Sequence, residues 1–251
     1  MWELYDDLIA SIPAELSVRE CLVGLHWTLV RSRATGVALN VRGEHQRLSM
    51  AGKIKGKPVR CLAESIKSWN FIDATVGIAA LNSTLNTKEQ VESMIGRPLS
   101  VQKQENAFEN FAEKVRGKKV AVIGHFPDLE RMSEICELSI LERRPEKGDY
   151  PDSACEYILP EQDVVFITAT TLTNKTLPRL LELSRQAFTV LVGPSTPITP
   201  VLFNYGVDVL AGSVVIDGDD TWHTVQEGGV REIFDHGTLM VTIAKEELVM
   251  C

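Results

Sequence analysis

The chain has 251 residues, a formal net charge of −8, 24% charged residues and 44% hydrophobic residues. This composition is typical of a folded soluble protein with one large domain or two small ones. The acidic balance argues against a nucleic-acid surface, because phosphate binding needs clustered lysines and arginines. The sequence contains no run of 18 apolar residues, so we expect no membrane partner.

The cysteines and the first residues predict a cytoplasmic protein. Five cysteines stand at positions 21, 61, 136, 155 and 251, an odd number without the spacing of a zinc or redox motif. Scattered cysteines are typical of buried thiols in a reducing compartment. The opening residues, Met-Trp-Glu-Leu-Tyr-Asp-Asp, lack the basic flank and apolar stretch of a signal peptide.

The first hundred residues predict antiparallel strands with helices. Residues 1–14 have apolar positions at helical spacing and end at Pro13. Val18–Arg31 alternates apolar and polar residues and is expected to form one strand, paired with Thr35–Val41. Residues 42–57 are polar and predict a loop or a ragged third strand. Helices are expected over Val59–Trp69, Phe71–Leu85 and Thr87–Ile95. Asn70 precedes the second of these helices as a capping residue, and Thr87 begins the third as its cap.

From Lys119 onward, short apolar strands alternate with helices. The expected strands are Val120–Ile123, Ser139–Glu142, Val164–Ile167, Phe188–Val192 and Val207–Leu210. The expected helices lie around Leu129–Cys136, Ser153–Ile158, Leu177–Arg185 and Pro200–Tyr205. Such alternation implies right-handed βαβ units and a parallel sheet. We therefore predict an α/β protein with a small α+β domain over residues 1–100 and a parallel-sheet domain over residues 101–251.

The segments after the parallel strands are the first place to look for a site, because the carboxyl ends of these strands share one edge. Gly124-His125-Phe126-Pro127 follows the first of these strands. A histidine here can act as a metal ligand or as a catalytic acid or base. It can equally be a loop residue that is hydrogen-bonded to backbone. His125 is thus a candidate for ligand binding, metal binding and catalysis.

A second segment, residues 168–174, has the sequence Thr-Ala-Thr-Thr-Leu-Thr-Asn. Its polar side chains, above all Thr168, Thr170, Thr171 and Asn174, can offer hydroxyls and an amide to a polar ligand or an anion. Capping of the next helix is the structural alternative, since Ser, Thr and Asn satisfy the free N–H groups of a helix start. Five polar side chains exceed what one cap requires.

A third segment, residues 193–200, has the sequence Gly-Pro-Ser-Thr-Pro-Ile-Thr-Pro. Thr199 as the cap, Pro200 at the first helical position and Gly206 at the far end define a short helix. The candidate ligand-binding residues are Gly193, Pro194, Ser195 and Thr196, in a loop that three prolines stiffen. A rigid turn without a ligand is the structural alternative.

A fourth, weaker candidate is Ala211-Gly212-Ser213, expected as a loop after the fifth strand and including the candidate Gly212. The acidic run Asp217-Gly-Asp-Asp220 is expected to begin a helix, although its carboxylates could also bind a cation. The sequence contains neither G-x-G-x-x-G nor a Walker motif, which disfavours ordinary dinucleotide or P-loop binding. It also lacks the G-x-S-x-G elbow of many hydrolases.

At these segments the sequence resembles an uncharacterised prokaryotic family described as a heavy-metal chelation domain. The matching stretches are Gly77–Asn82, Thr168–Thr176, Gly193–Pro200 and the run from Gly206 to Asp217, so the resemblance covers most of the chain. Ala169 stands where we would expect a glycine. The resemblance implies an enolase-N-terminal-like domain followed by a Rossmann-like domain, with a ligand cleft between them and a metal ion or metal chelate as the cofactor or cargo. In that picture Asn82 faces the cleft, and Asn40, Arg42 and Glu44 lie at its rim.

Two functions are favoured at this point, and a third, a structural or regulatory module, would need an exposed apolar patch that the sequence does not reveal. The first is a binding protein for a small molecule or metal chelate, since hydroxyl-rich loops suit a preformed organic chelate better than a bare soft ion. The second is an enzyme for a small anionic or phosphorylated metabolite, with the anion on Ser195 and Thr196 and His125 as acid or base. The sequence does not name the ligand or the oligomeric state.

Overall fold

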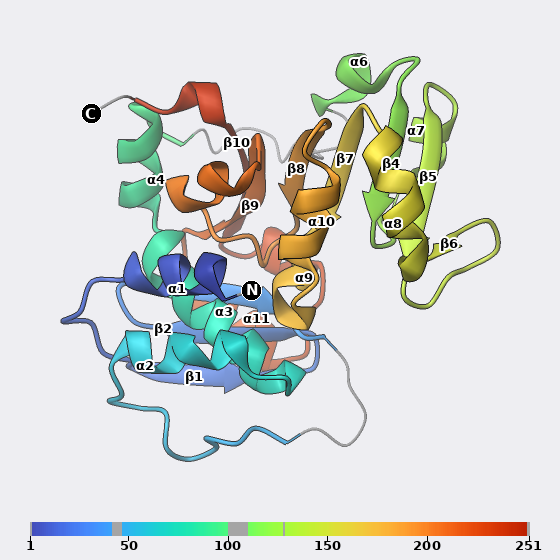
Figure 1. Cartoon of the computed structure of the whole chain (residues 1–251). Coiled ribbons are helices and arrows are strands. Elements are labelled where there is room, and N and C mark those ends of the chain that lie inside the picture. Colours follow the sequence, from blue (N-terminus) through green and yellow to red (C-terminus); the bar gives the residue numbers. More distant parts are fainter. Residues whose placement is uncertain (1, 42–46, 100–109, 128, 250–251) are drawn as a thin grey trace.

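The computed structural model describes residues 2–41, 47–99, 110–127 and 129–249. Within them the chain forms a three-stranded antiparallel sheet and a seven-stranded, mostly parallel sheet (Figure 1). This confirms the α/β class and the change of plan along the chain. The domain boundary expected between residues 100 and 101 falls within residues 100–109, outside the described part, and the division into two domains stays a prediction.

The small sheet has the order β1-β2-β3, from Glu20–Val23, Trp27–Arg31 and Thr35–Leu39. The single strand expected over Val18–Arg31 is wrong, because the chain reverses after β1. The Gly24 N–H donates to the carbonyl of Trp27 at 2.9 Å and closes this turn. Leu25, which continued the apolar alternation, lies at the turn and is 74% exposed.

Helix α3 (Phe71–Leu85) packs against β2 and β3. The Asn70 side chain accepts a hydrogen bond from Ile72 N at 3.1 Å and starts the helix at the predicted residue. Gly36 allows the close packing: a Cβ there would lie 2.1 Å from Ser83 N and 2.2 Å from Ala79 O. Helix α2 (Val59–Ala63) with the 3-10 helix η1 (Glu64–Lys67) precedes α3, and α4 (Lys88–Ile95) follows it.

The large sheet has the order β10-β9-β8-β7-β4-β5-β6, with only β10 antiparallel to its neighbour. Its strands are β4 (Lys119–Ile123), β5 (Glu137–Glu142), β6 (Tyr150–Pro151), β7 (Val164–Thr168), β8 (Phe188–Val192), β9 (Val209–Val215) and β10 (Thr238–Ala244). Among its helices are α6 (Ala112–Val115), α7 (Leu129–Ser133), α8 (Cys155–Ile158), α9 (Thr170–Asn174), α10 (Leu177–Leu183), η4 (Pro200–Tyr205) and α11 (Gly218–Gln226). Four further 3-10 turns are η2 (Asp152–Ala154), η3 (Leu159–Glu161), η5 (Glu232–Phe234) and η6 (Lys245–Glu247).

Helices cover both faces of the large sheet, and helices from different parts of the chain cover each face. Residues of α6 and α7 pack on one face, against alternate β4 residues such as Val120 and Val122. Residues of α10 and η4 join the hydrophobic cluster on the other face, with Ala121 and Ile123. The β4–β5 and β7–β8 connections thus lie on opposite faces. The order of the strands reverses between β4 and β7, a topological switch point at which open α/β sheets bind ligands.

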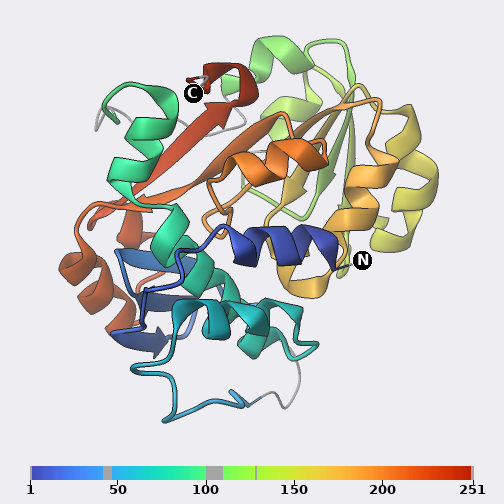
Figure 2. The ribbon, with the colours of Figure 1, turned by 60° about the vertical axis from the view of Figure 1, so that its left-hand side comes forward.

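The amino-terminal helix α1 (Glu3–Ala10) lies between the half of the molecule that contains the small sheet and the half that contains the large sheet (Figure 2). The Tyr5 hydroxyl donates to the carbonyl of Leu172 at 3.3 Å, and the Tyr205 hydroxyl donates to Asp7 Oδ2 at 2.6 Å. One hydrophobic cluster includes residues of α1, α3 and the large sheet. Among the described helices, none combines the length and apolar character needed to cross a membrane.

The end of the chain differs from the expectation. Strand β9 was expected to end at Leu210, but it continues to Val215 and pairs along its whole length with β10. The expected loop at Ala211-Gly212-Ser213 is therefore wrong, because these residues lie inside a paired strand. The alternation over Thr238–Ala244 indicates a strand, and such a strand needs a partner as long as Val209–Val215.

Candidate functional site

A cavity of about 250 Å³ lies at the carboxyl ends of β4, β5 and β7, beside the switch point. We call it the edge pocket. Parts of α8, α9 and α10 complete its wall: α9 lies at the lower end of the sheet in Figure 1, and α10 packs against both α8 and α9. All four candidates of the second segment line it, together with residues that the sequence analysis did not single out: Gly124, Glu142, Arg143, Cys155 and Arg179.

The hydroxyls of the edge pocket come from the start of α9. This segment is a helix that begins directly after β7 and not the open loop expected over residues 168–174. The Thr168 and Thr170 hydroxyls lie 3.1 Å apart, and both residues are partly exposed. Thr171 is buried, and its hydroxyl donates to the carbonyl of Thr168 at 2.6 Å. The Thr171 hydroxyl is thus used by a backbone carbonyl, and Thr168 Oγ1 accepts from Thr170 N at 3.4 Å, whereas Thr168 and Thr170 both line the cavity.

The end of α9 is fixed by two polar residues. Asn174 Oδ1 accepts hydrogen bonds from Thr176 N at 3.0 Å and from the Thr176 hydroxyl at 2.6 Å. Lys175 follows with a left-handed backbone (φ 67°), and its Nζ donates to the carbonyls of Thr173, at 2.6 Å, and Ser68. Burial lowers the pKa of Lys175 to about 8, because the protein interior disfavours the charged ammonium group.

The charged groups of the edge pocket largely neutralise one another. Glu156 forms a two-pronged ion pair with Arg179, with Nε–Oε1 at 2.9 Å and Nη2–Oε2 at 2.5 Å. This hydrogen-bonded pairing lowers the pKa of the exposed Glu156 carboxyl and raises that of Arg179. Glu142 is partly exposed and ends β5, where its Oε1 accepts from Arg143 N at 2.7 Å and Arg144 N at 3.2 Å.

Cys155 is the thiol of the edge pocket. Burial is the main cause that raises its pKa, and the nearby Glu156 and Asp152 carboxylates add to the shift. The thiol therefore stays protonated at neutral pH, whereas a soft metal ion binds the thiolate. This residue gives the pocket a small, weakly polar wall.

His125 lies outside the edge pocket, in a separate hollow with α7 and the Glu146–Asp149 turn. Its Nδ1 lies 3.3 Å from Asp149 Oδ2, which also accepts from Glu146 N at 3.0 Å. Within the described residues, no three His, Cys, Asp or Glu side chains are grouped so that they could hold a metal ion. The structure thus separates His125 from the threonines with which the sequence analysis grouped it.

The third segment, residues 193–200, is buried against the N-terminal half. Ser195 Oγ accepts from Leu39 N at 2.8 Å, and the Asn82 amide donates to the carbonyls of Val37, at 2.8 Å, and Ser195, at 3.1 Å. Asn82 and Thr196 are 0% exposed. These contacts join α3, β3 and the segment after β8 into one interior, so the structural alternative describes this segment better than a ligand loop does.

The neighbours of that segment support the same interpretation. The Gly193 N–H donates to Ala211 O at 2.9 Å, and Ser213 Oγ donates to Pro194 O at 2.9 Å. Gly212 lies beneath Thr196, where a Cβ would approach the Thr196 carbonyl oxygen to 2.8 Å. Two atoms differ: Asn82 Oδ1 and Thr196 Oγ1 are buried and have no hydrogen-bond partner among the described residues, so the structural alternative does not account for them.

The residues expected at the rim of a cleft are accounted for only in part. Asn40 Oδ1 accepts from the Thr28 hydroxyl at 2.6 Å, and its Nδ2 donates to Gly24 O at 2.7 Å. Asn40 thus braces the β1–β2 turn. Arg42 and Glu44 lie outside the described residues.

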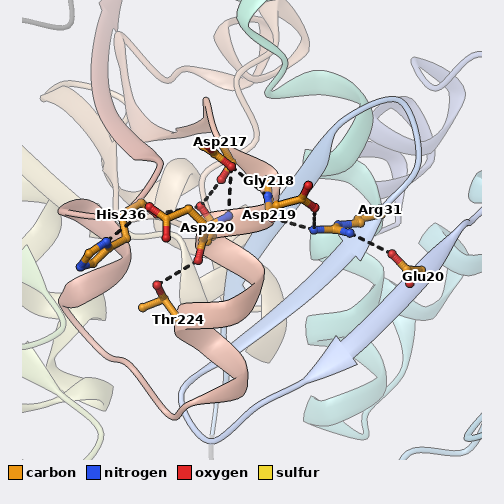
Figure 3. Close-up of polar contacts among 9 residues, drawn as sticks. Glu20, Arg31, Asp217, Gly218, Asp219, Asp220, Thr224 and His236 are labelled. Atoms are coloured by element: carbon orange, nitrogen blue, oxygen red, sulfur yellow. Dashed lines mark hydrogen bonds and ion pairs between the residues drawn. The ribbon is translucent and has the colours of Figure 1, made fainter.

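A larger hollow of about 540 Å³, which we call the arginine hollow, lies where Arg19, Arg31 and Arg33 meet α4 and the start of α11. Arg31 donates to Glu20 at 3.0 Å and to Asp219 at 2.7 Å (Figure 3). Asp217 caps α11 by accepting from Asp219 N and Asp220 N, each at 3.0 Å. The lining has four cationic side chains and three carboxylates, and Asp219 pairs with Arg31, so most of the positive charge of the hollow is offset.

The fold and the edge pocket define a doubly wound α/β protein with a cavity at its switch point. Two family models match the chain: DUF364, described as "Putative heavy-metal chelation", matches residues 106–244, and DUF4213, with the same description, matches residues 5–85. The chain belongs to the DUF364 family, which confirms the resemblance found in the sequence.

Three known proteins show the extent of the similarity. A DUF364 protein of unknown function from Desulfitobacterium hafniense is 40% identical, with a TM-score of 0.90 over 98% of this chain and 99% of that one. A second DUF364 structure, from Pyrococcus horikoshii, is 23% identical, with a TM-score of 0.77 over 96% and 98%, and shows the same fold. The uncharacterized protein MJ0500 of Methanocaldococcus jannaschii is 28% identical over 196 residues, which are 74% of this chain and 72% of that protein.

Proposed function

We propose that this protein binds a small polar organic molecule in the edge pocket. The observation that carries the proposal is the convergence of the Thr168 and Thr170 hydroxyls and the Glu142 carboxylate on one cavity at the switch point of the sheet. Open α/β sheets bind their ligands at this position. The N-terminal half reaches the rim through α3, because the Phe71 ring lies 5.7 Å from the Arg143 guanidinium. All residues that line the edge pocket nevertheless lie between positions 123 and 180, so the proposed site belongs to the C-terminal half and not to a cleft between the two halves.

The donor set of the edge pocket fits a preformed metal chelate better than a bare heavy-metal ion. Soft ions prefer thiolate and imidazole ligands. Cys155 has a raised pKa, and His125 lies in another hollow. Hydroxyl and carboxylate groups can instead hold the organic part of a chelate by hydrogen bonds. In this way the proposal accommodates the description of the family.

The alternative of an enzyme for a phosphorylated metabolite gains no support from the arrangement of its residues. It needs His125 beside an anion site on Ser195 and Thr196. Ser195 and Thr196 are buried, with the Ser195 hydroxyl bonded to Leu39 N, and His125 lines a different hollow.

Native mass spectrometry combined with elemental analysis tests the proposal. The purified protein is incubated with the low-molecular-weight fraction of a cell extract. We expect the wild type to retain a small organic molecule, with or without metal, and Thr170→Phe to lose it by filling the cavity. Thr242→Phe on β10, at the far edge of the sheet, is the matched control and should retain it. Equal occupancy of all three forms, or none in the wild type, contradicts the proposal.

A further inference from the structure

The position of Glu142 in the sheet narrows the class of ligand. In the order β6-β5-β4-β7-β8-β9, strand β4 comes first in the chain and β5 second, which is the order 3-2-1-4-5-6 of dinucleotide-binding sheets. Glu142 is the last residue of β5 and lines the edge pocket. An acidic side chain at the end of the second strand is placed to accept hydrogen bonds from the hydroxyls of a ribose bound over the first strand.

The local geometry leaves one oxygen of Glu142 for such a ligand. The backbone N–H groups of Arg143 and Arg144 both donate to Oε1 and fix the orientation of the carboxylate. Oε2 is then the oxygen that can accept from a bound molecule. A carboxylate that is already oriented loses little side-chain entropy when a ligand binds.

The rest of the edge pocket fits a nucleoside and not a dinucleotide. Its lining includes three apolar residues, Ile123, Leu141 and Leu180, which we call the apolar floor. They are at most 8% exposed and offer a small apolar contact for one face of a planar base. Its volume of about 250 Å³ lies below the range of roughly 300–1,000 Å³ that is typical for drug-sized ligands. A compact ligand is therefore favoured.

The turn after β4 and the ion pairs of the two arginines in the pocket disfavour a phosphate. Gly124 is followed by His-Phe-Pro and not by a glycine-rich turn, and the next described helix, α7, has only five residues. Arg179 is held by Glu156 and, at 2.8 Å, by Glu182. Arg143, the other arginine of the pocket, has its Nε 3.7 Å from Asp152 Oδ2. A phosphate would therefore have to displace a carboxylate from one of these two guanidinium groups.

From these observations we propose that the edge pocket takes a ribonucleoside that carries no phosphate, with its vicinal hydroxyls on Glu142. The inference rests on the proposed function and names the ligand class for the same site. The base packs on the apolar floor, and the hydroxyls of Thr168 and Thr170 lie on the β7 side of the cavity.

Isothermal titration calorimetry on the full chain tests this with adenosine, guanosine, cytidine and uridine as probes. We expect at least one of them to bind, and its 2′-deoxy form to bind about tenfold more weakly or worse, because a hydrogen bond to a charged acceptor is lost. The 5′-monophosphate of that nucleoside and free ribose should also bind more weakly. No binding of any of the four, or equal affinity for the deoxy form, the monophosphate or ribose, overturns the inference.

Glu142→Gln sharpens the test without disturbing the turn. Glutamine keeps an oxygen for the Arg143 and Arg144 N–H groups and replaces the other oxygen with a donor. We expect about tenfold weaker ribonucleoside binding and the loss of the preference over the deoxy form. Glu137→Gln, at the opposite end of β5, is the control and should bind like the wild type. Equal behaviour of the two variants contradicts the assignment.

The two proposals can fail separately. If mass spectrometry finds a retained molecule that Thr170→Phe loses, and this molecule is not a ribonucleoside, the edge pocket stands as a binding site and the nucleoside inference falls. If nothing is retained and no nucleoside binds, both fall.

Discussion

Two segments of this protein have almost the same sequence pattern and opposite surroundings. Residues 168–174 and 193–200 each follow a buried parallel strand, contain several hydroxyls and lead into a helix. The first lines a cavity at the switch point, whereas the second is covered by α3 and β3 and bonded to them. Hydroxyls at the carboxyl edge of a sheet can thus serve a ligand or another part of the chain. The covering element decides between these uses, and it lies more than a hundred residues away.

The largest expected difference between the two segments concerns an asparagine side chain that hydrogen-bonds to the backbone at each segment. Asn86 donates to Thr196 O at 2.9 Å and Ser213 O at 3.0 Å, and its Oδ1 accepts from Ile198 N at 2.8 Å. Asn86→Ala leaves three buried backbone groups without partners and should destabilise the protein by about 3 kcal/mol or more. Asn174→Ala, in the segment that lines the edge pocket, should lower the free energy of unfolding by about 1 kcal/mol or less. Urea unfolding measures both, and equal losses would show that the second segment is not the structural one.

A pH-dependent test concerns Lys175, which directly follows residues 168–174. Its buried ammonium group hydrogen-bonds to backbone carbonyls, so this end of the segment contributes to the structure of the protein as well as to the pocket. Its pKa of about 8 in the folded state lies below the ordinary value of 10.5. Below pH 8 the lysine is charged in both states, and the folded state carries the full cost of burying the charge. Between pH 8 and 10.5 the unfolded state binds more protons, so stability rises with pH, by about 3 kcal/mol in all.

Lys175→Met removes the titrating group and should remove this rise. The measurement is the free energy of unfolding of both proteins from pH 7.5 to 10.5, taken as the difference between them, so that other groups cancel. Parallel pH profiles would show that the ammonium group of Lys175 is as well solvated in the folded protein as in the unfolded chain.

The smallest expected effects come from removing one hydroxyl in each segment, Ser195 and Thr170, and measuring both stability and ligand retention. Ser195→Ala removes the acceptor for Leu39 N and should reduce stability by about 1–2 kcal/mol while leaving ligand retention intact. Thr170→Val should leave stability within about 0.5 kcal/mol and weaken retention of the ligand. Unfolding curves give the stability of each variant, and native mass spectra give the amount of ligand that each retains. If Ser195→Ala reduces retention as strongly as Thr170→Val, the division between a ligand segment and a structural segment is incorrect.

The sequence predicted those parts of the fold that depend on local patterns. The limits of α3 follow from the Asn70 cap, the start of α4 follows from Thr87, and the buried parallel strands follow from short apolar runs. The β1–β2 turn was missed because Leu25 continued the apolar alternation through it.

The candidate site could be predicted less well, because it depends on strand order and on distant covering elements. Thr168, Thr170, Thr171 and Asn174 were found from their position after a strand. Glu142 was already the last residue of a predicted strand, and the rule for the second strand of a doubly wound sheet could have singled it out. Nothing in the local sequence marks Cys155 or Arg179, which reach the edge pocket through tertiary packing.

The hydrogen bonds of Asn86 also bear on the synthesis of the protein. Its amide donates to Thr196, 110 residues further along the chain. A ribosome therefore completes α3, nearly all of which is buried in the finished protein, long before the segment that covers it exists. Chains grow at about 5–20 residues per second, so this apolar helix waits several seconds or more for its partner. During that interval the nascent chain presents a surface that chaperones recognise, and a slower stretch of translation before residue 193 would prolong its exposure.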